Sequence, residues 1–197
     1  MTNTIDAIHF QELARMNPEE VCRRTSCHYD YSNKCYLQPV WDFELNVYAE
    51  KAKIDCTGNS KPHEYFCLFA VHYLLKAKAI EISGNWISEK DIPGGPTFFR
   101  GPHEIPTNLI SNRFGNDVSE FSRVCEQFSG TPLDMADAAY RFEITPKIPV
   151  AVLYWTGDED FPAESKLLYD QTITEHLASD IVYALAVGIC KRLGGAA

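Results

Sequence analysis

The stretch from Pro62 to Lys78, PHEYFCLFAVHYLLKAK, limits the possible folds more than any other part of the chain. Its apolar residues recur with the 3.6-residue period of an α-helix and fill two stripes rather than one, which predicts a helix over 62–78. One stripe comprises Phe66, Phe69, Ala70, Tyr73, Leu74 and Ala77, and the other comprises Leu68, Val71 and Leu75. Because both sides of such a helix must be covered, we expect it to be buried at the centre of the fold.

The ends of this helix carry terminal signals. Ser60 is suited to cap its first turn, and Pro62 fits a position whose backbone needs no N–H donor. Lys76 and Lys78 stand where the negative end of the helix dipole is expected.

Length and charge narrow the class of protein. A chain of 197 residues with 45% hydrophobic and 23% charged residues predicts a single globular domain spanning 1–197. Its net charge of −9 repels phosphate backbones, so we expect no nucleic-acid partner. The first ten residues lack the basic and apolar regions of a signal peptide, and no apolar run reaches membrane length. We therefore expect a cytoplasmic protein with no membrane association.

The segments before the central helix divide into helices and then strands. Residues 5–16 have helical spacing, and Asn17 and Pro18 restart a second helix. Between Cys27 and Cys56 the apolar period changes to two, which predicts an antiparallel meander of three or four strands.

The segments after the central helix mix both types of element. We expect strands at 80–82, 140–144 and 150–155, and helices at 106–114, 118–128 and 172–193. The continuous apolar run at 150–155 indicates a central strand. Strands grouped early and late, with helices between them, predict an α+β fold in which helices surround an antiparallel sheet and the 62–78 helix crosses it.

The first candidate site is the loop Asp91–His103, DIPGGPTFFRGPH. Gly94 and Gly95 allow a ligand close to the backbone, Arg100 offers a forked donor for an anion, and Phe98 and Phe99 can line an apolar pocket. The alternative is ordinary turn chemistry, with one Phe anchoring the loop.

The second candidate site is the segment Trp155–Pro162, WTGDEDFP, which follows the expected central strand. Its three adjacent acids suit a cation or a basic ligand group. The alternative is a solvated acidic turn in which Asp158 or Asp160 accepts backbone hydrogen bonds. Asp134 and Asp137 form a weaker pair of the same kind.

The seven cysteines are the third candidate. A four-ligand metal or cluster site is conceivable from Cys22, Cys27, Cys35 and Cys56, with His28 nearby. The chain contains no C-x-x-C pair, however, and Cys67, Cys125 and Cys190 fall on expected helices. We therefore predict no metal site and reduced thiols that pack as small apolar groups.

Both loops also carry a resemblance to a known family. The segments that carry it are Trp86, Ile92–Phe98, Gly101–His103, Tyr154–Ala163 and Leu167–Asp170. They resemble motifs of a domain-of-unknown-function family found mostly in anaerobic bacteria and archaea, and the resemblance covers most of the chain after residue 60. Some relatives carry an added iron–sulfur cluster domain, which these 197 residues do not include, so we infer no redox chemistry from it. The resemblance implies an anaerobic cytoplasmic setting and points to the same two loops.

These observations lead to one leading function and two alternatives. The leading one is a small-molecule or cofactor-binding domain, an accessory in anaerobic metabolism, with an anionic ligand between the two loops and no cofactor assigned. The expected ligand-binding residues are Trp86, Gly94, Gly95, Phe99, Arg100, His103, Trp155, Asp158 and Asp160. The first alternative is a hydrolase or lyase using His103 as acid or base with Asp158 or Asp160. The second is a non-catalytic module that binds a protein partner through exposed aromatic residues.

Overall fold

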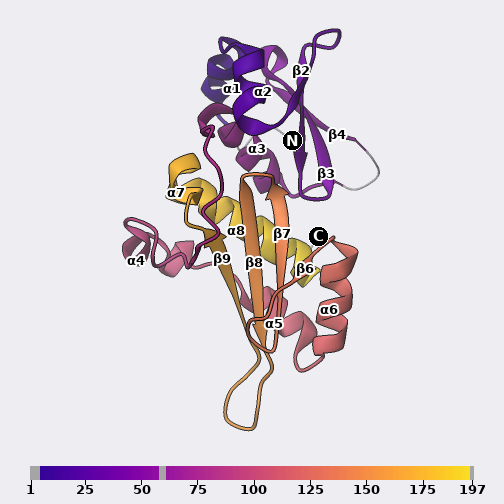
Figure 1. Ribbon diagram of the computed structural model, residues 1–197, viewed down its shortest axis with the longest axis vertical. Coiled ribbons are helices and arrows are strands. Elements are labelled where there is room, and N and C mark those ends of the chain that lie inside the picture. Colours follow the sequence, from indigo (N-terminus) through magenta and orange to yellow (C-terminus); the bar gives the residue numbers. More distant parts are fainter. Residues whose placement is uncertain (1–4, 58–60, 196–197) are drawn as a thin grey trace.

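Two antiparallel sheets lie towards opposite ends of the molecule, and helices α3 (Glu64–Lys76) and α8 (Ser179–Gly194) pack against each other between and behind them (Figure 1). The computed structural model describes residues 5–57 and 61–195. The α+β class is confirmed, and its strands form two sheets where the sequence predicted one. No helix in the described ranges is both long enough and apolar enough to cross a membrane.

The N-terminal part follows the expected order. Helix α1 (Ala7–Ala14) begins after Asp6, and helix α2 (Pro18–Thr25) begins after Asn17, whose side chain accepts a hydrogen bond from the Glu19 N–H at 2.9 Å. The meander then runs β1 (His28–Asp30), β2 (Cys35–Val40), β3 (Phe43–Tyr48) and β4 (Lys53–Thr57), with the 3₁₀ turn η1 (Ala49–Lys51) joining the last two. All neighbours pair antiparallel, so the predicted antiparallel meander of three or four strands is confirmed, with four strands.

Helix α3 (Glu64–Lys76) is the buried centre that the sequence predicted. Both apolar stripes are covered, because α3 packs on α8 on one side and on α1, α2, β2 and β3 elsewhere. The helix is shorter than the predicted 62–78. His63 rather than Ser60 precedes it, and its Nδ1 accepts the Tyr65 N–H at 3.3 Å. Ser60 itself lies outside the described residues.

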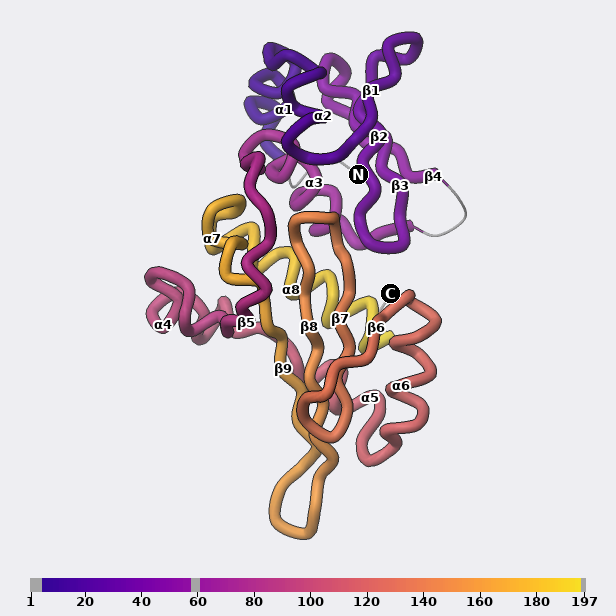
Figure 2. Tube along the Cα trace, viewed as in Figure 1, coloured from indigo at the N-terminus to yellow at the C-terminus, as the bar shows by residue number. Residues whose placement is uncertain are grey.

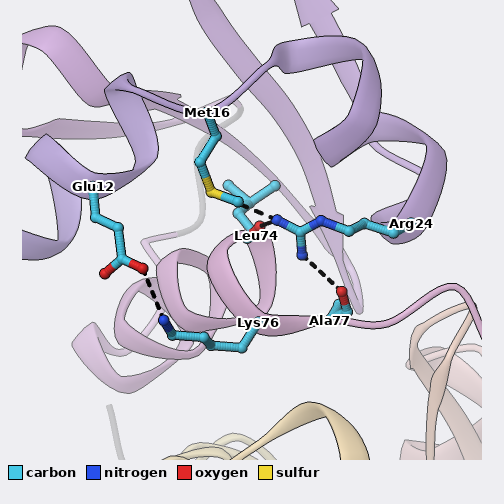
Figure 3. Close-up of polar contacts among 6 residues, drawn as sticks. All are labelled: Glu12, Met16, Arg24, Leu74, Lys76 and Ala77. Carbon is cyan, nitrogen blue, oxygen red and sulfur yellow. Dashed lines mark hydrogen bonds and ion pairs between the residues drawn. The ribbon is translucent and has the colours of Figure 1, made fainter.

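A buried arginine completes the other end of α3 (Figure 3). Arg24 is 7% exposed and donates to the carbonyl oxygens of Leu74 at 2.6 Å and Ala77 at 2.7 Å. The cation therefore satisfies carbonyls that the last helical turn leaves unpaired, and it faces the negative end of the dipole. Of the two lysines predicted for this end, Lys76 lies in the last turn and forms an ion pair with Glu12 at 2.8 Å, and Lys78 lies beyond the helix and pairs with Glu175 at 2.7 Å.

The second sheet has the order β5-β9-β8-β7-β6, and all its strands are antiparallel. Its strands are β5 (Trp86–Ile87), β6 (Thr131–Pro132), β7 (Ala138–Thr145), β8 (Ile148–Trp155) and β9 (Glu164–Asp170). Strand β8 is central, as predicted. Strand β9 was missed, and the strand predicted at Ile80 and Ile82 is wrong, because that segment is irregular and pairing begins only at Trp86.

The remaining helices surround this sheet. They are α4 (Gly95–Phe98), the 3₁₀ turn η2 (Gly101–His103), α5 (Asn108–Phe114), α6 (Val118–Gln127), α7 (Ile173–His176) and α8 (Ser179–Gly194). The single helix predicted from Thr172 is interrupted, because Leu177 has an extended backbone. The Thr172 hydroxyl donates to Asp170 at 2.6 Å instead of capping the helix.

The two faces of the second sheet differ. Side chains of Val150, Val152 and Tyr154 join the main core, which α8 covers behind the sheet in Figure 1. The opposite face carries a separate cluster of Ala139, Ala151 and Leu153, bordered by the half-buried side chains of Trp86, Leu133, Met135, Trp155 and Leu168. We call this surface the outer sheet face.

Candidate functional site

The loop between β5 and α5 is folded onto the core by two buried side chains, Ile92 and Phe99. Gly95 is also buried, and its N–H donates to the Ile92 carbonyl oxygen at 2.7 Å. A Cβ atom at Gly95 would lie 2.0 Å from the Glu89 carbonyl oxygen, so this glycine permits a close backbone approach within the loop. The structure therefore gives Gly95 and Phe99 positions in the loop's interior, where the sequence predicted contacts with a ligand.

The solvent-facing side of this loop borders a hollow of about 650 Å³ that is wide open to solvent. We call it the loop hollow, and it is lined by Gly94, Thr97, Phe98, Arg100, Gly101, Pro102 and His103. Its volume falls in the range of roughly 300 to 1,000 Å³ that is usual for small-molecule sites. Gly94 and Gly101 bound the segment at φ values of 77° and 57°, which glycine adopts without strain.

Stacked rings form one wall of the loop hollow. Phe98 lies parallel to the His103 imidazole, with ring centroids 4.6 Å apart and an interplanar angle of 11°. Tyr183 from α8 packs edge-on against His103 at 5.4 Å, and its hydroxyl donates to the Pro102 carbonyl oxygen at 3.1 Å. Helix α8 therefore contacts the loop at Pro102 and at the His103 imidazole.

Arg100 supplies the positive charge of the loop hollow. Its side chain is exposed and forms neither a hydrogen bond nor an ion pair with any residue of the described ranges. A guanidinium group presents several N–H donors in a plane, in the arrangement that carboxylate and phosphate groups accept. The loop hollow thus combines a flat ring surface with an available anion-binding group.

The acidic segment lies elsewhere. Residues 156–163 form the hairpin between β8 and β9, and Figures 1 and 2 show it projecting below the lower end of the sheet, whereas α4 lies at the side of the sheet. Asp158 accepts the backbone N–H groups of Asp160 at 2.9 Å and Phe161 at 2.8 Å, and these bonds lower the pKa of its carboxyl group. This is the geometry of a solvated acidic turn.

Other contacts hold the same hairpin in shape. Asp137 accepts hydrogen bonds from the Thr156 N–H at 2.8 Å and hydroxyl at 2.7 Å, and the Gly157 N–H donates to Asn116 at 2.8 Å. Trp155, at the base of the hairpin, lies on the outer sheet face with the Lys166 ammonium 5.6 Å from its ring centroid. The structure therefore brings Gly94, Arg100 and His103 together but does not join them to Trp155, Asp158 or Asp160.

Trp86, also predicted to bind the ligand, lies on another surface. It pairs with Asp170 across β5 and β9 and lines a separate hollow of about 490 Å³ with Ile87, Asp91, Pro93, Gln171 and Thr174. Its ring also borders the outer sheet face.

Asp170 fixes the start of the segment that leads to the candidate loop. This residue is 3% exposed, and its carboxylate accepts hydrogen bonds from Ser83, Gly84 and Thr172, including both backbone N–H and hydroxyl donors. Burial opposes its ionisation, but the donors outweigh burial and lower the pKa of Asp170 to about 2. The carboxylate therefore stays charged and holds residues 83–84 beside the end of β9.

The cysteines do not form a metal centre within the described ranges, where no group of three or more His, Cys, Asp or Glu side chains is placed to hold an ion. Cys35, Cys67, Cys125 and Cys190 are buried in the core, and burial raises the pKa of each of these thiols. Cys22 and Cys27 are half-buried and in mutual contact.

A comparison with known families gives a match that covers most of the chain. A model of a family described as a domain of unknown function, DUF3786, matches residues 17–192. The chain belongs to this family. No curated protein and no solved structure matches the chain. The DUF3786 match runs from the residue that caps α2 into the last turns of α8, so it includes both sheets, the loop hollow and the hairpin.

Within this DUF3786 domain, sequence reasoning missed several residues of the loop hollow, namely Thr97, Gly101, Pro102 and the supporting Tyr183. Gly101 and Pro102 stand inside the segment that the sequence had singled out. Tyr183 is 80 residues away from His103 in the chain and looks like any other position of an amphipathic helix, so no local signal connects it to the loop.

Proposed function

We propose that this DUF3786 domain binds a small anionic molecule that has a flat apolar body, and that the loop hollow is the binding site. The observation that carries the proposal is the exposed Arg100 side chain, which has no partner in the described ranges and lines a hollow together with the stacked Phe98 and His103 rings. The guanidinium would hold the anionic group, and the ring wall would take up the apolar body.

The negative charge of the rest of the molecule makes Arg100 a more selective site for an anion. The chain has a net charge of −9, so an anion approaching most of the surface is repelled. A local cation in a hollow with apolar walls is therefore a selective place for an anion. The family resemblance supports placing this role in the cytoplasm of an anaerobe, as an accessory in metabolism.

A thermal-shift screen tests the proposal. Phenyl phosphate and benzoate combine an anion with a flat ring, and benzyl alcohol supplies the ring without charge. A ligand at 100 times its dissociation constant stabilises the folded chain by about 2.7 kcal/mol. We expect one of the two anions to raise the unfolding midpoint, and benzyl alcohol to leave it unchanged.

Two variants localise the effect. Arg100→Gln removes the charge at an exposed position, so the folded domain should remain and the anion-dependent shift should disappear. Arg15→Gln removes another exposed arginine, after α1, and should keep the shift. Equal shifts in both variants, or no shift with either anion in the unmodified chain, would reject the loop hollow as the site.

His103 lines the loop hollow, whereas Asp158 lines a different hollow with Gly157 and Phe161, and Asp160 belongs to the same turn as Asp158. The hydrolase or lyase alternative therefore has no geometric support. General acid and base catalysis needs the two groups within about 3 Å of each other or of one shared water. His103 instead contacts Phe98 and Tyr183, and Asp158 is engaged by its own turn.

One observation favours the interaction module as a second candidate function, with a second copy of the chain as the partner. The outer sheet face is apolar at its centre, and its edge charges balance, with Arg141 and Lys166 against Glu143 and Glu164. Two such faces can meet without the repulsion that a net charge of −9 imposes elsewhere. Sedimentation analysis of the unmodified chain and of Leu168→Glu tests this candidate. A dimer that the substitution dissociates supports it, and a monomer at all concentrations rejects it.

A further inference from the structure

Two thiols meet at the end of helix α2. The Sγ atoms of Cys22 and Cys27 lie 3.2 Å apart, and the Cys27 thiol donates to the Cys22 sulfur. Both side chains are half-buried, whereas Cys35, Cys67, Cys125 and Cys190 are enclosed in the core. The pair is therefore in contact with itself and within reach of solvent.

The cap of α2 creates this contact. Ser26 adopts the left-handed conformation at φ 61°, and its N–H donates to the Cys22 carbonyl oxygen at 2.8 Å. A left-handed cap turns the chain back so that residues on either side of it touch, and that contact is usually between apolar side chains. Here the positions on either side are both cysteines, five residues apart.

Neighbouring contacts hold the cap firmly. The Thr25 hydroxyl is buried and donates to the Val21 carbonyl oxygen at 2.7 Å, and Arg24 is fixed to the end of α3 by its two carbonyl contacts. Because residues 21, 24 and 25 are each fixed, the two thiols are held together by packing that does not involve the sulfurs.

We propose that Cys22 and Cys27 form a reversible dithiol–disulfide site whose co-reactant is a low-molecular-weight disulfide of the glutathione class. Formation of the bond requires the sulfurs to approach from 3.2 Å to about 2.0 Å. The two residues bracket a single helix cap, so side-chain rotation at the surface supplies this approach while the helix keeps its position.

The exchange proceeds in two balanced steps. The Cys22 thiolate attacks one sulfur of the small disulfide, which breaks its S–S bond, forms a mixed disulfide at Cys22 and releases one small thiolate. Cys27 then loses its proton and attacks the Cys22 sulfur, which breaks the mixed disulfide and releases the second small thiolate. The two protons from the protein thiols leave with the two small thiolates, so the protein is oxidised by two electrons and the small disulfide is reduced to two thiols.

The environment of the pair sets the order of these steps. Burial, opposed in part by a hydrogen bond with Thr25, raises the pKa of Cys27 to about 12, and the adjoining Cys22 thiol adds to the effect. A thiol that stays protonated is a poor first nucleophile, because the thiolate is the reactive form. The first attack therefore falls to Cys22, and Cys27 resolves the mixed disulfide from 3.2 Å away.

Trypsin provides a direct assay, because Arg23 and Arg24 lie between the two cysteines. The full chain is reduced, exposed to oxidised glutathione, blocked with N-ethylmaleimide in acid and digested. Closure of the proposed bond joins the peptides 16–23 and 25–34, which otherwise separate. We expect this joined pair to be the dominant form in the oxidised sample and to disappear after dithiothreitol treatment.

Variants distinguish the two roles. Cys27→Ser should accumulate glutathione on Cys22 and form no joined peptides, whereas Cys22→Ser should show little modification of Cys27. Cys56→Ser, which removes a half-buried thiol from β4, should behave as the unmodified chain does. Near-ultraviolet circular dichroism checks that each variant is folded. Free thiols, a stable glutathione adduct on Cys22, or a bond to another cysteine in the folded unmodified chain would overturn the proposal.

Discussion

Replacing Asp170 with Asn should destabilise the domain in a way that depends on pH. The carboxylate of Asp170 accepts two backbone N–H groups from Ser83 and Gly84, a third from Thr172, and the hydroxyls of Ser83 and Thr172. Asn keeps the size of the side chain but replaces one accepting oxygen with a donor. Gly84, whose N–H lies 2.7 Å from Oδ2, or one of the other donors would then lose its acceptor.

The magnitude follows from the lowered pKa. Each tenfold change in proton affinity corresponds to about 1.4 kcal/mol. A shift from the ordinary value of 3.8 to about 2 makes the ionised carboxylate worth roughly 2 kcal/mol of folding free energy. Because the pKa is lower in the folded state, this stability is present above about pH 4 and is lost as the pH falls towards 2.

Urea unfolding of both proteins at a series of pH values measures the effect. At pH 7 the Asp170→Asn variant should be less stable by about 2 to 3 kcal/mol, and the gap should narrow steadily between about pH 5 and pH 2. Asp91→Asn is a suitable control, because its exposed carboxylate accepts two bonds from Ser88 on the surface. A gap at Asp170 that keeps the same size at every pH would refute the assignment of its stability to the ionised carboxylate.

Two further substitutions test the core and the loop. Arg24→Met should lower the free energy of unfolding, measured in urea, by about 3 to 5 kcal/mol, because two buried carbonyls at the end of α3 lose a charged donor. Arg23→Met, at an exposed position, should change it by less than about 0.5 kcal/mol, and equal effects of the two substitutions would contradict the buried role of Arg24. Gly95→Ala should lower the thermal unfolding midpoint more than Gly94→Ala, because a Cβ added at Gly95 lies 2.0 Å from the Glu89 carbonyl oxygen. At Gly94 the added Cβ has open space, and only the backbone conformation is strained. The reverse order of midpoints would contradict this packing.

Much of the fold was predictable where local signals and tertiary packing agree. The two apolar stripes of 62–78 correctly predicted a buried central helix, and Asn17 with Pro18 correctly marked the start of α2. The continuous apolar run of 150–155 correctly predicted the central strand β8.

Errors arose where another contact replaced the one that the sequence pattern favours. The pattern of Thr172 and Glu175 is that of a capping box, yet Asp170 captures the Thr172 hydroxyl, and the helix breaks at Leu177. Strand β9 is not among the predicted strands, although Ser165, Leu167 and Tyr169 are buried in alternation with Glu164, Lys166 and Leu168.

The candidate site was predictable in its residue types but not in its assembly. The loop at 91–103 does bring Gly94, Arg100 and His103 to one hollow. The loop is separated from the 156–163 hairpin by the length and pairing of β8 and β9. Because strand β9 was not predicted, this separation could not be predicted either. The contact of Tyr183 with His103 likewise depends on how α8 packs, and no short-range pattern encodes that contact.

The most direct test of the ligand-binding account is a titration of the ¹⁵N-labelled chain with phenyl phosphate, followed by amide chemical shifts. The account predicts saturable shifts at the amides of residues 94–103 and near Tyr183, with the amides of the 156–163 hairpin unchanged. The same titration of Arg100→Gln should produce no saturable shifts. Shifts centred on the hairpin, or shifts at 94–103 that persist in Arg100→Gln, would contradict it.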